Sequence, residues 1–136
     1  MAAERPVPIA DPLTEPYWQG AQSGRLMLPR CRDCGAWHFY PKSRCPACAS
    51  TALEWSQASG RGQVYSFTVV HRAPSPAFAA EVPYCVAVVA LDEGPHLMTR
   101  IVDCAPDTVA IGLRVKVRFA AVDESVALPV FSPEAA

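Results

Sequence analysis

The sequence predicts a mainly β protein, in which a short N-terminal helix and a four-cysteine metal module are followed by a five-stranded antiparallel barrel. Two Cys-x-x-Cys pairs lie ten residues apart within residues 31–48, and several short apolar runs follow them. Proline, at 14 of 136 residues, is about twice as frequent as the average of roughly 5% and stands between these runs. Because 51% of the residues are hydrophobic and 18% are charged, the chain can form a packed core.

The first expected unit, residues 1–24, combines an arm with a helix. Residues 1–12 carry three prolines and no periodicity, which predicts an extended arm. Thr14 is a suitable N-cap, Pro16 is tolerated in a first turn, and Gly24 is a stop signal. The pattern therefore predicts a helix over about 14–23.

The predicted helix has an aromatic side, formed by Tyr17 and Trp18. Aromatic residues on so short a helix need a packing partner. They either cover the core of the same chain or form an interface with a partner protein.

The second expected unit, residues 25–55, is a metal site. Two Cys-x-x-Cys knuckles offer four thiolates to one tetrahedral zinc, and four sulfurs leave no open position for water or substrate. Gly35 permits a positive φ after the first pair, and Pro46 stiffens the second. The spacing therefore predicts structural Zn²⁺ bound by four residues: Cys31, Cys34, Cys45 and Cys48.

Other uses of these cysteines fit the pattern less well. Disulfides need an oxidising compartment, and the N-terminus shows no basic segment followed by a long apolar run, so we expect a reducing cytoplasm. A redox pair would sit beside a strand and open a helix, whereas both pairs lie in a segment rich in proline and arginine. Iron is the alternative metal, since tetrahedral sulfur sites take either.

The third expected unit, residues 56–136, is the barrel. β-branched and aromatic runs separated by glycine and proline are typical of short strands. A DEGP turn joins the second and third runs into a hairpin, and Pro129 places the last strand at an edge. The predicted strands lie at 64–70, 84–92, 96–103, 114–122 and 128–131.

Two of these strands differ in the faces that they bury. The run at 84–92 is apolar at successive positions, which predicts burial on both faces. The run at 114–119 alternates arginine or lysine with Val115, Val117 and Phe119, which predicts one wet face. Cys85 and Cys104 fall in or beside strands and are expected to be core thiols.

Charge is distributed unevenly along the chain. Residues 25–72 hold seven basic and two acidic side chains, a balance of +5, and the remainder holds five basic and eleven acidic ones, a balance of −6. A positive module favours a phosphate-bearing partner, although arginines also simply solvate a loop-rich module. No stretch approaches 18 uninterrupted apolar residues, so no membrane span is expected.

The residues do not suggest a catalytic centre. The histidines, His38, His71 and His96, are scattered, and the sequence has no Gly-x-Ser-x-Gly elbow, Walker loop or dinucleotide glycine pattern. We therefore expect a protein that acts through binding.

Several motifs in order resemble one known family. CRDCGAWHFYPKSRCPAC is followed by LEW, SGRGQVYSFTVVHR, PYCVAVVALDEGPHLMTRIVD, IGLRVKV and LPVF. This series closely resembles the zinc-ribbon OB-fold proteins of acyl-CoA metabolism, long catalogued as a domain of unknown function. The resemblance runs from about Tyr17 to Phe131.

The resemblance implies a rubredoxin-like zinc ribbon, an OB-fold barrel and an accessory role. Members of that family pair with a thiolase-like enzyme, a lipid-transfer-protein-like aldolase or an acyl-CoA hydratase, and help to form a site for a CoA ester. We therefore expect a hetero-oligomer that binds acyl-CoA, with Tyr17 and Trp18 available to the partner.

Three further residues are candidates for acyl-CoA binding. Arg61 and Arg72 flank the first barrel strand and could meet the phosphates of CoA, and Phe78 lies on an apolar loop beyond it. Surface solvation and ordinary loop packing are the plain alternatives for each.

Single-stranded nucleic-acid binding is the alternative function, since ribbons and OB folds both serve it, but a sequence pI of about 6.3 and the lack of a basic tail favour acyl-CoA.

Overall fold

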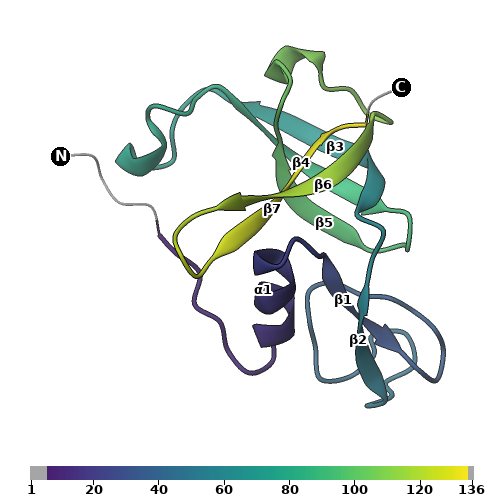
Figure 1. Ribbon diagram of the computed structural model, residues 1–136. Helices are drawn as coiled ribbons and strands as arrows, with labels where there is room; N and C mark the ends of the chain where they lie inside the picture. Colours follow the sequence, from purple (N-terminus) through teal and green to yellow (C-terminus); the bar gives the residue numbers. More distant parts are fainter. Residues whose placement is uncertain (1–5, 135–136) are drawn as a thin grey trace.

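The computed structural model describes residues 6–134, so the first five residues of the expected arm lie outside the described residues. Within this range the chain forms one α-helix and seven strands (Figure 1). The barrel lies at one end of the molecule, and the helix and a two-stranded sheet lie together at the other. Among the described residues, no helix is long and apolar enough to cross a membrane.

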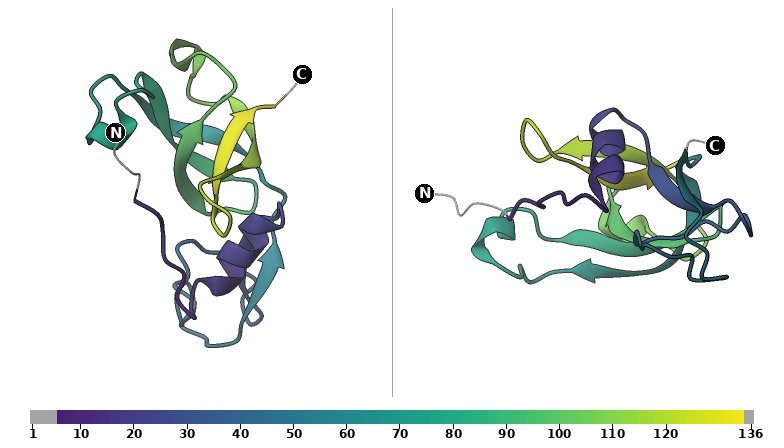
Figure 2. Two further views of the ribbon diagram at one scale, coloured as in Figure 1. Left: turned by 60° about the vertical axis from the view of Figure 1, so that its left-hand side comes forward. Right: turned by 90° about the horizontal axis from the view of Figure 1, so that it is seen from below.

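Helix α1 (Glu15–Gln22) forms where the stop and start signals predicted it. Thr14 is the N-cap, but its side chain does not bond the first turn; its backbone N–H instead donates to a carboxylate oxygen of Asp11 at 2.8 Å. Gly24 ends the helix with a φ of +78°, a conformation that favours glycine. The helix contacts β1, β6 and β7, so it joins the two parts of the molecule (Figure 2).

The ribbon contains a two-stranded sheet that the sequence analysis did not predict. β1 (Met27–Cys31) pairs antiparallel with β2 (Leu53–Gln57), and the segment that carries the last three of the four cysteines lies between them. β1 contains Pro29 and an arginine, which hides its strand character in the sequence. Leu26 and Leu28 are fully buried and anchor β1 to the core.

The barrel has the five strands that the sequence predicted. They are β3 (Arg61–Val70), β4 (Tyr84–Leu91), β5 (His96–Ile101), β6 (Arg114–Ala121) and β7 (Ala127–Pro133), closed in the order β3-β4-β5-β7-β6. Short 3₁₀ turns lie at Pro76–Phe78 and Pro106–Thr108. β4 and β5 form the predicted hairpin.

The expectation of a purely antiparallel barrel was wrong, because β5 and β7 run parallel. Strand directions cannot alternate all the way around a closed ring of five, so at least one neighbouring pair must be parallel. Here the parallel seam carries a single ladder pair within the described residues, Ile101 with Phe131. The barrel is therefore mixed, and the β5–β7 seam is its least paired side.

Pro129 lies at this seam and not at a free edge, because the barrel is closed. The Pro129 carbonyl accepts a hydrogen bond from the Thr99 hydroxyl of β5 at 2.9 Å. Since the nitrogen and carbonyl of one strand residue point to the same side, the nitrogen of Pro129 also faces β5, and the β6–β7 ladder loses no bond. The missing N–H of Pro129 therefore faces the parallel seam, where it removes no hydrogen bond from the antiparallel β6–β7 ladder.

Burial follows the alternation of the strands. In β4, Cys85, Ala87, Val89 and Leu91 are buried, whereas the residues between them are only partly buried, so the prediction of burial on both faces was wrong. In β6, Val115 is buried and the arginines and lysine are exposed, as predicted. Cys85 is fully buried in the core and Cys104 packs against it.

Candidate metal centre and apolar cavity

The four predicted metal ligands converge in the ribbon. The sulfur atoms of Cys31, Cys34, Cys45 and Cys48 all lie within 4.8 Å of one another. Cys31 Sγ is 3.6 Å from Cys48 Sγ, and Cys34 Sγ is 3.6 Å from Cys45 Sγ. All four are free thiols, and these separations exceed the disulfide bond length of about 2.05 Å.

The spacing of the sulfurs fits a tetrahedral ion. With Zn–S distances of about 2.3 Å, the edge of the tetrahedron is about 1.63 times longer, or about 3.8 Å. The four residues can therefore hold one zinc with little movement. Such a shell stabilises the fold of the ribbon and offers no position for a reacting group.

The two knuckles are built alike. The residue four positions after the first cysteine of each pair has a positive φ, +76° at Gly35 and +65° at Ala49, and its N–H donates to the carbonyl of that cysteine. This turn points both sulfurs of a pair to one side. Main-chain N–H groups, led by that of Cys34, lower the pKa of the Cys31 thiol to about 7.

His38 does not belong to the described cluster of cysteines. Its side chain is buried, and neither ring nitrogen has a hydrogen-bond partner among the described residues. Burial, assisted by the charge of Lys42, lowers the pKa of His38. The imidazole is therefore held neutral within the ribbon.

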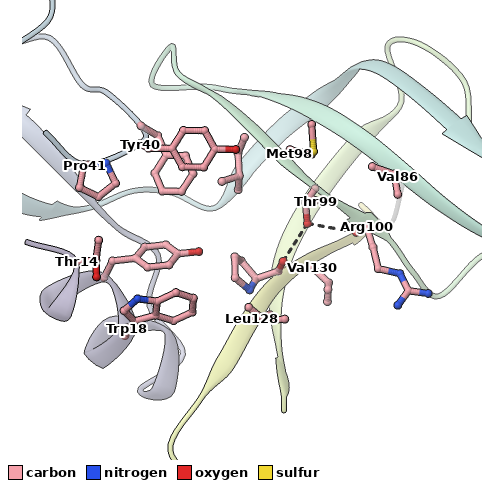
Figure 3. A pocket seen from close by; sticks show the side chains of 14 residues that line it. Thr14, Trp18, Tyr40, Pro41, Val86, Met98, Thr99, Arg100, Leu128 and Val130 are labelled. Carbon is pink, nitrogen blue, oxygen red and sulfur yellow. Dashed lines mark hydrogen bonds between the residues drawn. The ribbon is translucent and has the colours of Figure 1, made fainter. Parts of the chain in front are cut away.

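An apolar cavity of about 410 Å³ lies between the helix, the ribbon and the barrel. Figure 3 shows Thr14, the N-cap of α1, and Trp18 of α1 facing Tyr40 and Pro41 of the ribbon, with β5 and β7 along the remaining side. The lining comes from α1, residues 39–41, Val86, residues 97–100 and residues 128–130. The floor of the cavity is thus the poorly paired β5–β7 seam.

Aromatic contacts hold one wall of the cavity. The rings of Tyr17 and Trp18 meet edge to face at 4.9 Å, Tyr17 and Phe39 are 5.5 Å apart, and Phe39 and Tyr40 are 4.4 Å apart. Tyr17 is only 7% exposed and belongs to the core, whereas Trp18 is partly buried. Both residues singled out for a partner interface therefore line the cavity, and a role in partner contact stays a prediction.

The structure does not bring the three acyl-CoA candidates together. Arg61 and Arg72 lie at opposite ends of β3, whose ten residues span about 30 Å when extended. Arg61 forms an ion pair with Glu134, with Nε 3.4 Å from Oε1. Arg72 and Phe78 share the β3–β4 loop, in which Phe78 lies 6.5 Å from the ring of Tyr84. The two arginines cannot contact one phosphate.

Arg100, which the sequence analysis missed, lies where the cavity meets the outer face of the barrel. Its guanidinium is 2.7 Å from Glu81 Oε1 and stacks over Tyr84 at 4.0 Å. Thr99 and Leu128 were missed as well. No short motif connects these positions, because they come from strands far apart in the sequence.

Two family models match the chain in succession. The model for the ChsH2 rubredoxin-like zinc ribbon domain matches residues 18–54, and the model for the ChsH2 C-terminal OB-fold domain matches residues 55–120. Together they cover most of the chain and meet where β2 leads to the barrel.

Named relatives agree with these matches. The chain is 40% identical over 131 residues to a probable enoyl-CoA hydratase alpha subunit of Thermomonospora curvata, covering 96% of this chain and 40% of that protein. It is 40% identical over 100 residues to a DUF35 domain-containing scaffold protein of Methanocaldococcus jannaschii, covering 73% and 70%. The chain therefore spans well under half the length of the first of these relatives.

A solved structure has a similar fold over nearly its whole length. A chain of the structure titled Ltp2-ChsH2(DUF35) aldolase superimposes with a TM-score of 0.84 and 38% sequence identity. The match covers 93% of this chain and 98% of that one.

Proposed function

The chain belongs to the ChsH2 and DUF35 family, in which a rubredoxin-like zinc ribbon precedes an OB fold, and on this premise we propose that it is a non-catalytic subunit of an acyl-CoA enzyme. In this role it binds the CoA ester and supports a lipid-transfer-protein-like aldolase, a hydratase or a thiolase-fold partner.

One observation carries the proposal. Almost the whole of the matched chain in the structure titled Ltp2-ChsH2(DUF35) aldolase has a counterpart in this chain, and this supports a place in a similar enzyme complex. The name of the Thermomonospora curvata relative, an enoyl-CoA hydratase alpha subunit, favours a subunit of a larger enzyme as well. An aldolase or hydratase is therefore the preferred partner.

A bound zinc would support this role by stabilising the fold of the ribbon. When bound, zinc fixes the two knuckles and so the loop of residues 39–41, which packs against α1 through Tyr17 and Phe39. The closed sulfur shell leaves chemistry to the partner. Trp18, partly exposed at the mouth of the cavity, is proposed to contact the partner directly; buried Tyr17 would act by holding Trp18 in place.

Arg72 and Phe78 are the proposed contacts with CoA. Arg72 is exposed and has no ion-pair partner among the described residues, so it is available for a phosphate. Phe78, half-buried in the same loop, offers an apolar surface for pantetheine. Arg61, at the opposite end of β3 and next to Glu134, would reach only a second, distant phosphate.

Single-stranded nucleic-acid binding has weaker support. The OB-fold surface that serves this purpose is the outer face of the second and third barrel strands, here β4 and β5. That face presents Val86, Val88 and Met98 along with Tyr84 and His96, and its guanidinium, Arg100, is held by Glu81 and stacked on Tyr84. An apolar face with a neutralised charge favours a different ligand.

Reconstitution tests the proposal. The zinc-loaded chain is combined with a candidate aldolase or hydratase from the same organism, and size-exclusion chromatography and turnover of the CoA ester are measured with and without this chain. We expect a stable complex that buries well over 1,000 Å², with activity that depends on the chain. Activity unchanged by omission, with no complex, would contradict it.

A further inference from the structure

We propose that the cavity between α1, the ribbon and the β5–β7 seam binds an uncharged apolar group that carries a hydrogen-bond acceptor, and that this group is the acyl part of the CoA ester. The assignment to an acyl group rests on the proposed function. The chemical character of the cavity is argued from its lining, its volume and the hydroxyl of Tyr17.

The size and the walls of the cavity suit a small apolar molecule. Its volume of about 410 Å³ falls in the range of roughly 300–1,000 Å³ that is usual for small-molecule sites. Aromatic rings form one wall, and Leu97, Leu128 and Val130 form the opposite one. The walls are held by the aromatic cluster on one side and by barrel strands on the other, so the space does not collapse easily.

The charges at the cavity argue against an ionic ligand. Arg100 is the one charged residue in its described lining, and its guanidinium is already bound to Glu81 at 2.7 Å and stacked on Tyr84. A phosphate of CoA would have to compete with Glu81 in an apolar setting. The phosphates therefore belong outside, and the uncharged end of the ester belongs inside.

The Tyr17 hydroxyl supplies the specificity for an acceptor. Tyr17 is buried, lines the cavity, and forms no hydrogen bond among the described residues. Burial raises the pKa of Tyr17 above its usual range, so the hydroxyl keeps its proton and can donate. The neighbouring Thr99 hydroxyl already donates a hydrogen bond to the Pro129 carbonyl. An acceptor in the ligand could therefore accept a hydrogen bond from the Tyr17 hydroxyl.

Two probes of equal shape test this without CoA and without a partner. 2-Acetylnaphthalene has a carbonyl acceptor, and 2-isopropenylnaphthalene replaces that oxygen by a methylene group. Each is titrated into the zinc-loaded full chain, and binding is followed by ¹H–¹⁵N chemical shifts. We expect both to shift resonances of residues 39–41, 97–100 and 128–130.

Variants separate the cavity from the hydroxyl. Tyr17→Phe should weaken the ketone roughly two- to tenfold, as for loss of one neutral hydrogen bond, and leave the hydrocarbon unchanged. Leu128→Trp should fill the cavity and abolish both. Tyr65→Phe is the matched control, because Tyr65 is 58% exposed on β3 and outside the cavity, and it should change neither.

Three results would overturn the proposal: no shifts at the cavity with either probe, equal weakening of both probes by Tyr17→Phe, or binding that survives Leu128→Trp. Loss of probe binding when the enzyme partner is bound would mean that a partner side chain fills the cavity, and would overturn the acyl assignment. A cavity that binds the probes in a chain that forms no complex would instead refute the proposed function alone.

Discussion

The Thr99 hydroxyl on β5 donates a hydrogen bond to the Pro129 carbonyl on β7 at 2.9 Å, two residues before the ladder pair of Ile101 and Phe131 in each strand. The bond crosses the parallel seam where a proline removes the backbone donor. The Thr99 side chain thus donates the kind of interstrand hydrogen bond that a backbone N–H donates elsewhere in the barrel. This bond helps to hold β5 and β7 together beneath the cavity.

Thr99→Val should destabilise the protein although it preserves the volume of the side chain. Thr99 is only 8% exposed, so the valine would leave the Pro129 carbonyl without its donor at a cost of about 1–3 kcal/mol. Urea denaturation should show a lower midpoint with an unchanged m-value. Thr99→Ser keeps the hydroxyl and should cost about 0.8 kcal/mol for the lost methyl group; a serine variant less stable than the valine variant would contradict this account.

Cys45→Ser should remove the metal and loosen the ribbon but leave the barrel folded. Elemental analysis should find one zinc per chain in the wild type and far less in the variant, because one of four ligands is lost. Hydrogen exchange should quicken over residues 25–55 and in α1, which packs on Phe39, whereas β4 stays protected. Cys104→Ser, outside the cluster, should retain its zinc; less than half an equivalent in wild-type protein purified without chelator would refute the site.

His38 should make the protein less stable as the pH falls. Burial and the charge of Lys42 lower the pKa of His38 in the folded state. As the pH falls through the unfolded value of about 6.5, the unfolded chain therefore binds a proton at His38 more readily than the folded protein does, and protonation favours unfolding. The free energy of unfolding should therefore decrease between pH 7.5 and pH 5.5. The decrease should be smaller in His38→Phe and unchanged in His96→Gln, whose side chain is exposed; equal slopes in the wild type and His38→Phe would rule out this cause.

Replacing the candidate CoA contacts should act on binding more than on turnover. In the reconstituted complex, Arg72→Ala should raise KM for the CoA ester roughly three- to tenfold with little change in kcat, since a phosphate contact is made equally in the ground and transition states. Arg61→Ala should raise KM less, because Arg61 is already paired with Glu134. Arg25→Ala, an exposed cation outside the barrel, is the control; a fall in kcat at constant KM would contradict a binding role.

The metal site and the strands could be read from the sequence because local patterns encode them. Two cysteines separated by two residues form a knuckle wherever the chain places them, so the convergence of the four cysteines could be expected from their spacing alone. Alternation in β6 and the DEGP turn between β4 and β5 are equally local. β1 was not predicted because Pro29 and Arg30 interrupt its apolar pattern. Its pairing with β2 also depends on residues more than twenty positions away in the sequence.

Tertiary structure alone decided the seam and the cavity. The direction of β7 relative to β5 follows from closing a ring of five strands, a property of the whole sheet that no single strand displays. The sequence identifies Tyr17 only as an aromatic residue of the helix, and it is the packing of α1 between the ribbon and the seam that buries this residue beside the cavity. Hydrogen-bonding and burial patterns repeat over a few residues and are visible in a sequence, whereas a cavity is the space left between elements and depends on how distant segments meet.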